Sequence, residues 1–119
     1  ACPFIEQVML VGQDQKQLGA LVVPNEDQML KWARDKGIIL SKENLLRFPG
    51  EEKLTKALKR EINTLLQNRK GSRADERILG VALVDQFSIE NGLLTQTLKQ
   101  KRSKIVERDN ELITWIFSS

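Results

Sequence analysis

The chain has 119 residues, 40% of them hydrophobic and 29% charged, and a formal net charge of +3 at pH 7. This length suits a single domain with its own core, and the composition argues against disorder. One cysteine, Cys2, and no histidine exclude a disulfide framework, His/Cys metal sites and His-based nucleophilic catalysis within this chain. Cys2 is assigned no role, and no metal site is predicted.

No apolar run approaches the ~20 residues that cross a bilayer, so no transmembrane segment is predicted, and no signal peptide is visible. We therefore expect a cytoplasmic location, with peripheral contact at a membrane surface left open.

The first two predicted strands form a hairpin. Residues 5–11 (IEQVMLV) and 18–23 (LGALVV) are apolar and contain several β-branched side chains, a composition typical of strands. The polar segment QDQKQ between them resembles a turn, and Pro24 ends the second run. An antiparallel hairpin with a short loop is predicted.

Two helices are predicted next. Asn25 can cap the first, which ends at Gly37 and carries the apolar residues Met29, Leu30, Trp32 and Ala33. Residues 38–50 fit either a strand fragment or a loop with a helical turn. The second helix spans about residues 51–69, because its apolar side chains repeat at spacings of three and four: Leu54, Leu58, Ile62, Leu65 and Leu66.

A third strand is predicted at residues 78–84 (ILGVALV), and a last helix at about residues 101–117. The order β-β-α-α-β-α defines an α+β domain. We expect a small sheet of about three strands, made of the N-terminal hairpin and one later strand, with about three packed helices. Trp32 and Trp115 have apolar neighbours at helical spacing and are expected to pack in or near the core.

Positive charge concentrates in residues 99–104 (KQKRSK), which contribute +4, so that the remaining residues sum to −1. A local patch fits one anionic partner at one place. A nucleic-acid groove would need a longer basic stripe interleaved with aromatic residues. Because the chain has only six aromatic residues and no tyrosine, no nucleic-acid partner is expected, RNA included.

The segment that leads into this patch, residues 91–102 (NGLLTQTLKQKR), begins with the turn signal Asn91-Gly92. Its threonines favour extended backbone, so we predict an extended segment that presents Lys99 just before the last helix. Lys99 is then either part of a solvated helix start or a cation that reaches an anion held by another domain.

Two further features lead us to expect a module rather than a free-standing protein. The chain begins almost directly in a strand and without methionine. It also contains no Gly-rich phosphate-binding motif and no evident catalytic base. We expect a lid that acts on a site built elsewhere.

Residues 5–25 (IEQVMLVGQDQKQLGALVVPN) and 87–102 (FSIENGLLTQTLKQKR) together resemble the C-terminal subdomain of acyl-activating, adenylate-forming enzymes, and among these the long-chain fatty acid–CoA ligases and acyl–acyl carrier protein synthetases. The resemblance covers nearly the whole chain, so residues 1–119 would be that subdomain, without the large N-terminal domain and the hinge. Its most specific part is the set Phe87, Ser88, Asn91, Gly92, Leu94, Thr95, Thr97, Lys99, Lys101 and Arg102.

The resemblance implies a two-step ligation. A fatty acid carboxylate attacks the α-phosphate of MgATP to give acyl-adenylate and pyrophosphate, and a thiol then displaces AMP. The thiol belongs to CoA, with acyl carrier protein as the alternative acceptor. ATP with its Mg and the acyl chain would be held mainly by the N-terminal adenylation domain, while the C-terminal subdomain rotates between two poses.

In this family pattern Lys99 matches the lysine that enters the site during adenylation. Asn91, Gly92, Thr95 and Thr97 would shape the loop that supports it. The resemblance also makes Lys101, Arg102 and Lys59 candidate contacts to nucleotide or CoA phosphates, with Lys104 and Arg60 beside them. The alternative for these cations is an ordinary solvated helix face.

Two positions depart from the family pattern. Gln96 stands where many relatives have proline, and Leu93 where an acidic residue is common. The competing interpretation of the chain is a non-catalytic module whose basic segment docks an acidic partner such as acyl carrier protein. On either interpretation, we expect the isolated chain to lack ligase activity.

Overall fold

A computed structural model describes residues 3–12, 17–39, 41, 52–68 and 77–118. Its elements confirm the predicted order and, within one or two residues, the predicted strands and the first two helices. They are β1 (Ile5–Gly12), β2 (Gln17–Pro24), α1 (Glu26–Asp35), α3 (Glu52–Asn68), β3 (Arg77–Leu83), α4 (Arg102–Arg108) and α5 (Asn110–Ser118). The interpretations of residues 38–50 fall almost wholly outside the described residues.

The sheet has the order β1-β2-β3, with β1 antiparallel and β3 parallel to β2. The predicted hairpin and the α+β class are therefore confirmed, and the sheet is mixed. β2 lies at the centre, and its residues Ala20 to Val23 are buried. Such burial on both faces explains why this segment is a continuous apolar run rather than an alternating one.

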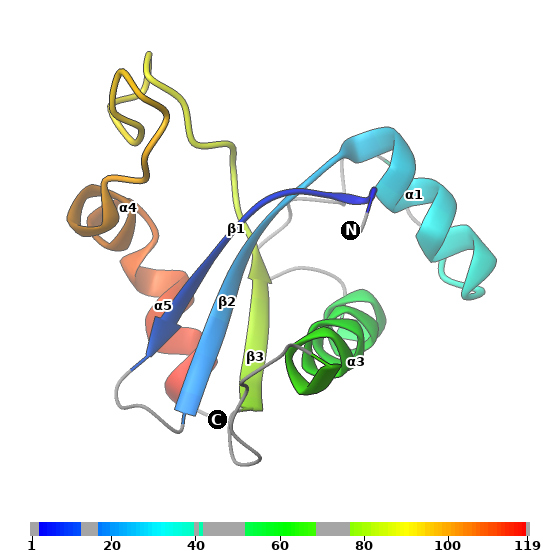
Figure 1. Cartoon of the computed structure of the whole chain (residues 1–119). Helices are drawn as coiled ribbons and strands as arrows, with labels where there is room; N and C mark the ends of the chain where they lie inside the picture. The colour runs from blue at the N-terminus through cyan, green and yellow to red at the C-terminus, as the bar shows by residue number, and fades with distance from the viewer. Residues whose placement is uncertain (1–2, 13–16, 40, 42–51, 69–76, 119) are drawn as a thin grey trace.

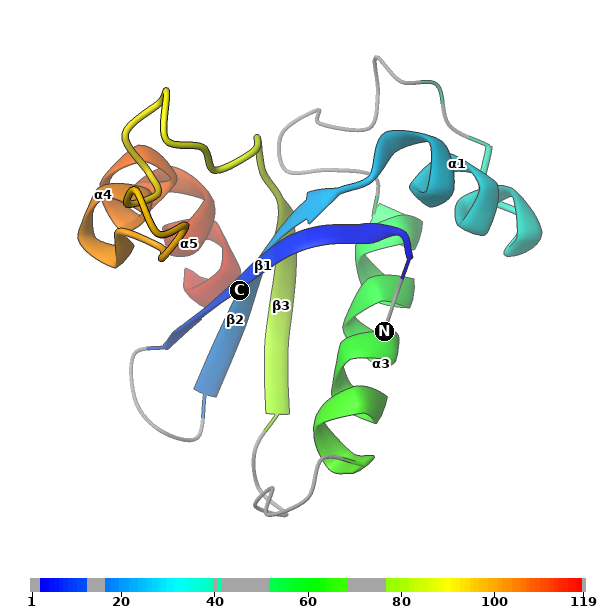
Figure 2. The same ribbon diagram turned by 45° about the horizontal axis from the view of Figure 1, so that its top comes forward.

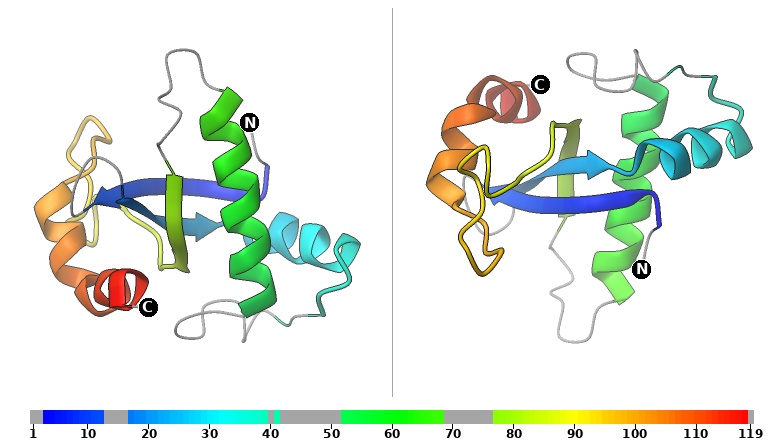
Figure 3. Two further views of the ribbon diagram at one scale, coloured as in Figure 1. Left: turned by 90° about the horizontal axis from the view of Figure 1, so that it is seen from below. Right: turned by 90° about the horizontal axis from the view of Figure 1, so that it is seen from above.

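Helices cover both faces of the sheet (Figures 1 and 2). α1 and α3 lie on one face, over a cluster that includes Met29, Leu54 and Ile78. The views from below and above place α4 and α5 on the other face (Figure 3), over a cluster that includes Leu21 and Ile105. Residues on α3 and residues on α4 therefore lie on opposite faces of the sheet.

α1 has the predicted cap. The Asn25 side chain accepts a hydrogen bond from the Gln28 backbone N–H at 3.2 Å, and Gly37 follows the helix with a φ of +78°. Trp32 is half-buried and stacks on Phe4 with ring centroids 4.3 Å apart, which fits the expected packing role. Trp115 is 38% exposed and lies outside both core clusters, so of the two expected positions, in the core or partly buried, the core position is wrong.

The single last helix predicted for residues 101–117 is wrong, because it breaks at Asp109. There the backbone leaves helical geometry with a φ of −104° and a ψ of +22°. The buried Asp109 carboxylate pairs with Arg108, with 2.8 Å between Nη2 and Oδ2. On a regular helix, adjacent side chains point in different directions and do not face each other. The pairing of Arg108 with Asp109 is therefore consistent with a break in the helix at this point. The described part of the chain therefore has four helices, none of them with the length and apolarity needed to cross a membrane.

α5 approaches the sheet closely where the strands carry glycine. A Cβ on Gly19 would lie 2.9 Å from Cγ2 of Ile116, and one on Gly80 would lie 3.2 Å from the same atom. Ile116 is buried, so its methyl group has little room to move.

We expect Gly19→Ala to destabilise the domain by about 1 kcal/mol or more through overpacking. Urea unfolding of single and double variants measures this. The cost should shrink when Ile116→Ala is already present, because the clashing methyl is gone. Equal costs in both backgrounds would contradict this account.

Candidate functional site

The segment between β3 and α4 carries most of the predicted site residues, and we call residues 87–101 the Lys99 loop. Its first half is a turn organised by Asn91. The Asn91 side chain accepts hydrogen bonds from the backbone N–H groups of Ser88 and Leu93 at 3.0 and 3.1 Å and donates to the Gln86 carbonyl at 2.9 Å. Gly92 has a φ of +79°, so the turn expected at Asn91-Gly92 is present.

Buried side chains attach this loop to the second core cluster. Phe87, Leu93 and Leu94 are 3%, 4% and 9% exposed and belong to the cluster under α4 and α5. An acidic side chain at position 93 would have to be buried there, so the departure to Leu93 suits the packing of this chain.

The second half of the loop is a small hairpin. The Thr95 N–H donates to the Lys99 carbonyl at 2.8 Å, and the Lys101 N–H donates to the Leu93 carbonyl at 2.9 Å. The Leu98 N–H returns to the Thr95 carbonyl at 2.9 Å, and Leu98 has a φ of +64°. This matches the three-residue hairpin loop in which a turn is followed by one left-handed residue.

The prediction of an extended segment before Lys99 is therefore wrong at its tip. Extended backbone runs only as far as Thr95 before the chain reverses. The hydroxyls of Thr95 and Thr97 lie 3.1 Å apart, and the Thr95 hydroxyl accepts from the Lys99 N–H at 3.0 Å. The threonines thus stabilise a turn by side-chain hydrogen bonding instead of extending the backbone.

Lys99 itself is exposed. Among the residues that the structure describes, its ammonium group forms no hydrogen bond and no ion pair. The cation therefore projects from a loop whose backbone is hydrogen-bonded and which Leu93 and Leu94 attach to the core, although the adjacent Leu98 is exposed.

The structure separates the other predicted cations. Lys101 and Lys104 are exposed near the start of α4, as Lys99 is on the preceding loop. Arg102 instead donates from Nη2 to the Leu10 carbonyl of β1 at 2.6 Å. Lys59 lies on α3, across the sheet from the Lys99 loop (Figure 1), so the fold does not bring it together with Lys99.

Among the pockets that the sequence did not predict, two contain several charged residues. A groove of about 420 Å³ between α1 and α3 is lined by the cations Lys36, Lys53, Lys56 and Arg60, together with Glu61. The spacings of three and four between positions 53, 56 and 60 are the signal that could have shown their common helix face.

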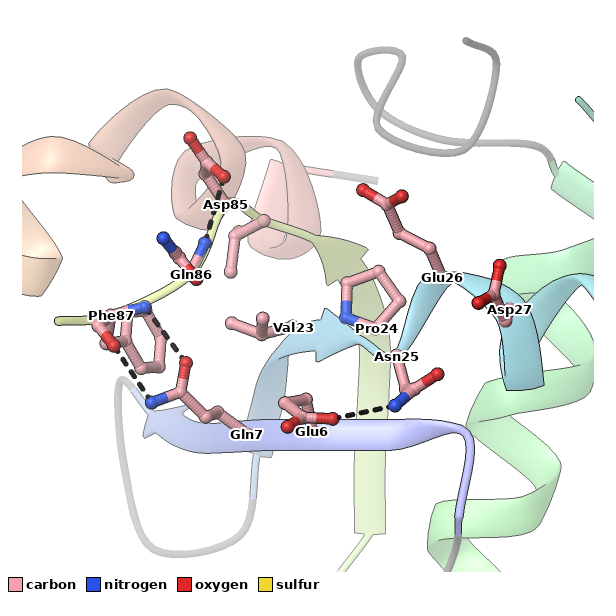
Figure 4. Close-up of a pocket in the computed structure, with 11 residues that line it drawn as sticks. Glu6, Gln7, Val23, Pro24, Asn25, Glu26, Asp27, Asp85, Gln86 and Phe87 are labelled. Carbon is pink, nitrogen blue, oxygen red and sulfur yellow. Dashed lines mark hydrogen bonds between the residues drawn. The ribbon is translucent and has the colours of Figure 1, made fainter. Parts of the chain in front are cut away.

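The second pocket, of about 760 Å³, lies at the carboxyl end of β2 (Figure 4). It is lined by acidic side chains from three segments of the chain, Glu6, Glu26, Asp27 and Asp85. Only the fold brings these together, and the pocket contains none of the predicted site residues.

Comparison with known proteins gives relatives along nearly the whole chain. The chain is 31% identical over 106 residues to the probable acyl-activating enzyme 16 of Arabidopsis thaliana. The matched region covers 88% of this chain and 14% of that protein. The chain is 34% identical over 103 residues to long-chain-fatty-acid–CoA ligase 1 of Cavia porcellus, covering 85% of this chain and 14% of the ligase. No protein-family model matches.

Among solved structures, the adenylation domain of carboxylic acid reductase from Segniliparus rugosus superposes with a TM-score of 0.71 and 23% identity, covering 98% of this chain and 16% of that one. This likeness supports the fold. The homologues of the chain are thus acyl-activating enzymes and long-chain fatty acid ligases, as the resemblance implied. The chain spans about one seventh of these two relatives, 14% of each.

The positive φ of Gly92 gives a test of the turn. A Cβ at this position meets no atom within 4 Å, so only the backbone conformation opposes substitution. We expect Gly92→Ala to cost about 1 kcal/mol and Gly92→Asn distinctly less, since asparagine tolerates left-handed backbone better. Urea unfolding measures both, and equal costs would contradict the assigned conformation.

Proposed function

We propose that this chain is the C-terminal lid of a fatty acid–thiol ligase, which activates a fatty acid as acyl-adenylate with MgATP and transfers it to CoA. The observation that carries the proposal is Lys99, an exposed cation without a described ion-pair partner on an anchored loop. Homology to long-chain fatty acid ligases supports it. Acyl carrier protein is the alternative thiol acceptor, and one relative is named as a ligase for that acceptor.

The chemistry of adenylation explains the need for such a cation. A carboxylate and a triphosphate repel each other, and charge on the phosphoryl oxygens changes during the transfer. A positive charge placed between the two offsets the repulsion and aligns the attack. Lysine suits this role because its charge is compact and its stem is long.

The remaining parts of the site belong to the rest of the enzyme in this proposal. ATP, its Mg and the acyl chain bind mainly to the N-terminal adenylation domain. Among the described residues, no three Cys, His, Asp or Glu side chains gather as a metal site, and we assign no step to a metal held by this chain. Lys101 is the exposed cation nearest in sequence to Lys99 for an additional phosphate contact, and Lys59 on α3 is a candidate only for a separate one.

The competing function is a non-catalytic docking module. The basic groove lined by Lys36, Lys56 and Arg60 favours it, because an acidic partner could bind there without Lys99. The two functions place the important charges on opposite faces of the sheet, so substitutions can separate them.

In the full-length ligase we expect Lys99→Ala to lower the rate of adenylation by a factor on the order of 10² or more, as for other groups that stabilise transition-state charge. Thioester formation from preformed acyl-adenylate should be spared. ATP–pyrophosphate exchange and single-turnover transfer measure the two steps.

Lys56→Ala is the comparison variant, because Lys56 is an exposed lysine of the basic groove on the far face, where it pairs with the exposed Glu52 3.0 Å away. The lid proposal expects it to leave both steps unchanged. If the chain is instead a docking module, Lys56→Ala should lower the rate of the thiol step, with strong salt dependence. Lys99→Ala should then keep a normal adenylation rate.

The chain by itself should not catalyse ATP–pyrophosphate exchange, since the proposal places the nucleotide and acyl sites elsewhere. Exchange assays with the purified 119-residue chain test this. Fatty-acid-dependent exchange that disappears in Lys99→Ala would refute the lid proposal.

A further inference from the structure

The two ends of the Lys99 loop are both attached to β1, which is an edge strand of the sheet. At the C-terminal end, Gln100 Nε2 donates to the Val8 carbonyl at 3.0 Å, and Arg102 Nη2 donates to the Leu10 carbonyl at 2.6 Å. Both bonds join residues that are 92 positions apart in sequence. The spacing of two matches the strand period, so these side chains follow β1 in register.

At the N-terminal end, the Gln7 side chain makes a second attachment (Figure 4). Its Nε2 donates to the Phe87 carbonyl at 3.0 Å, and its Oε1 accepts from the Phe87 N–H at 2.9 Å. The amide thus satisfies both backbone groups of Phe87, as a neighbouring strand would. Within four residues of β1, Gln7 to Leu10, the strand holds the loop at its beginning and at its end.

Arg108 tightens the beginning of the loop further. Its guanidinium donates to the carbonyls of Asp85 and Gln86 at 2.7 and 2.9 Å and lies 5.4 Å from the centre of the Phe87 ring. Because Arg108 also pairs with Asp109, the break between α4 and α5 is joined to the same point.

We infer that three side chains, those of Gln7, Gln100 and Arg102, are positioning residues for Lys99. We call these three residues the β1 clamp. The clamp makes the loop and the sheet one rigid body, so Lys99 is placed by the orientation of the whole domain and not by movement of the loop. This inference rests on the proposed function. It also gives Arg102 a different role from the phosphate contact expected from the sequence.

Lys99 is next to Gln100, so a shift at the clamp is transmitted directly to the cation. The hairpin of Thr95 to Lys99 has too few strands to be stable alone. Without the clamp, its position would depend on Leu93 and Leu94. A displacement of about 1 Å at a reacting group can lower a rate by a factor of about 10².

The test compares two double variants of the full-length ligase. Gln100→Met with Arg102→Met removes both donors to β1 and keeps unbranched side chains. Gln28→Met with Arg34→Met makes the same chemical change at exposed positions on α1. We expect the first to lower the adenylation rate about tenfold or more with little change in the KM for ATP, and the second to leave both unchanged.

The single variant Gln100→Met separates the clamp from a phosphate contact. Gln100 is neutral and its Nε2 already donates to the Val8 carbonyl, so its loss removes no positive charge that could attract phosphates. We expect this variant alone to lower the adenylation rate, and we expect backbone amides at Thr95 and Lys99 to exchange with solvent several-fold faster, since their hairpin loses support.

The outcomes distinguish failure of the clamp inference from failure of the proposed lid function. If Lys99→Ala leaves adenylation intact while the clamp variants still accelerate amide exchange, the proposed function fails and the clamp stands as a structural feature only, without a positioning role. Unchanged amide exchange in the clamp variants would overturn the inference. So would a normal adenylation rate in Gln100→Met together with a raised KM for ATP in Arg102→Met, and this second result would favour phosphate binding by Arg102.

Discussion

The structure combines two opposed features at Lys99: the cation is exposed to solvent, and the backbone that carries it is held in place. The domain meets both demands by burying the flanking residues Phe87, Leu93 and Leu94 under α4 and α5 and by closing a small hydrogen-bonded hairpin at the tip. Apolar burial supplies the anchoring energy, and the exposed ammonium group stays in contact with solvent. The loop is therefore an ordered part of the domain rather than a flexible tether.

The central strand β2 makes this arrangement possible. Since its side chains are buried on both faces, α3 and the Lys99 loop pack on opposite sides of the same three strands (Figure 3). Glycine at positions 19 and 80 lets α5 approach the sheet on the same face as α4. The far face, with its basic groove, is thus physically separate from Lys99.

Local signals in the sequence were enough to predict the strands, the Asn25 cap and the turn at Asn91-Gly92, because β-branched runs, capping residues and turn dipeptides act over a few residues. The hairpin tip was missed because its left-handed residue is Leu98, where glycine would be the usual signal. The pairing of Gln7 with Phe87 spans 80 positions, and the break at Asp109 depends on a partner beside it in the chain. The first became visible only when the fold brought the residues together, and the second gives no periodic pattern in the sequence although its partner is adjacent.

The attachment of Gln100 and Arg102 to β1 has a consequence for association between molecules. A bare strand edge offers a row of free carbonyl and amide groups on which a second chain can add a strand, and this is a route to aggregation. Here two successive outward carbonyls, those of Val8 and Leu10, are already occupied by side chains from the same molecule. A foreign strand would have to displace both before it could pair, so the contacts beside Lys99 also oppose strand addition at this part of β1.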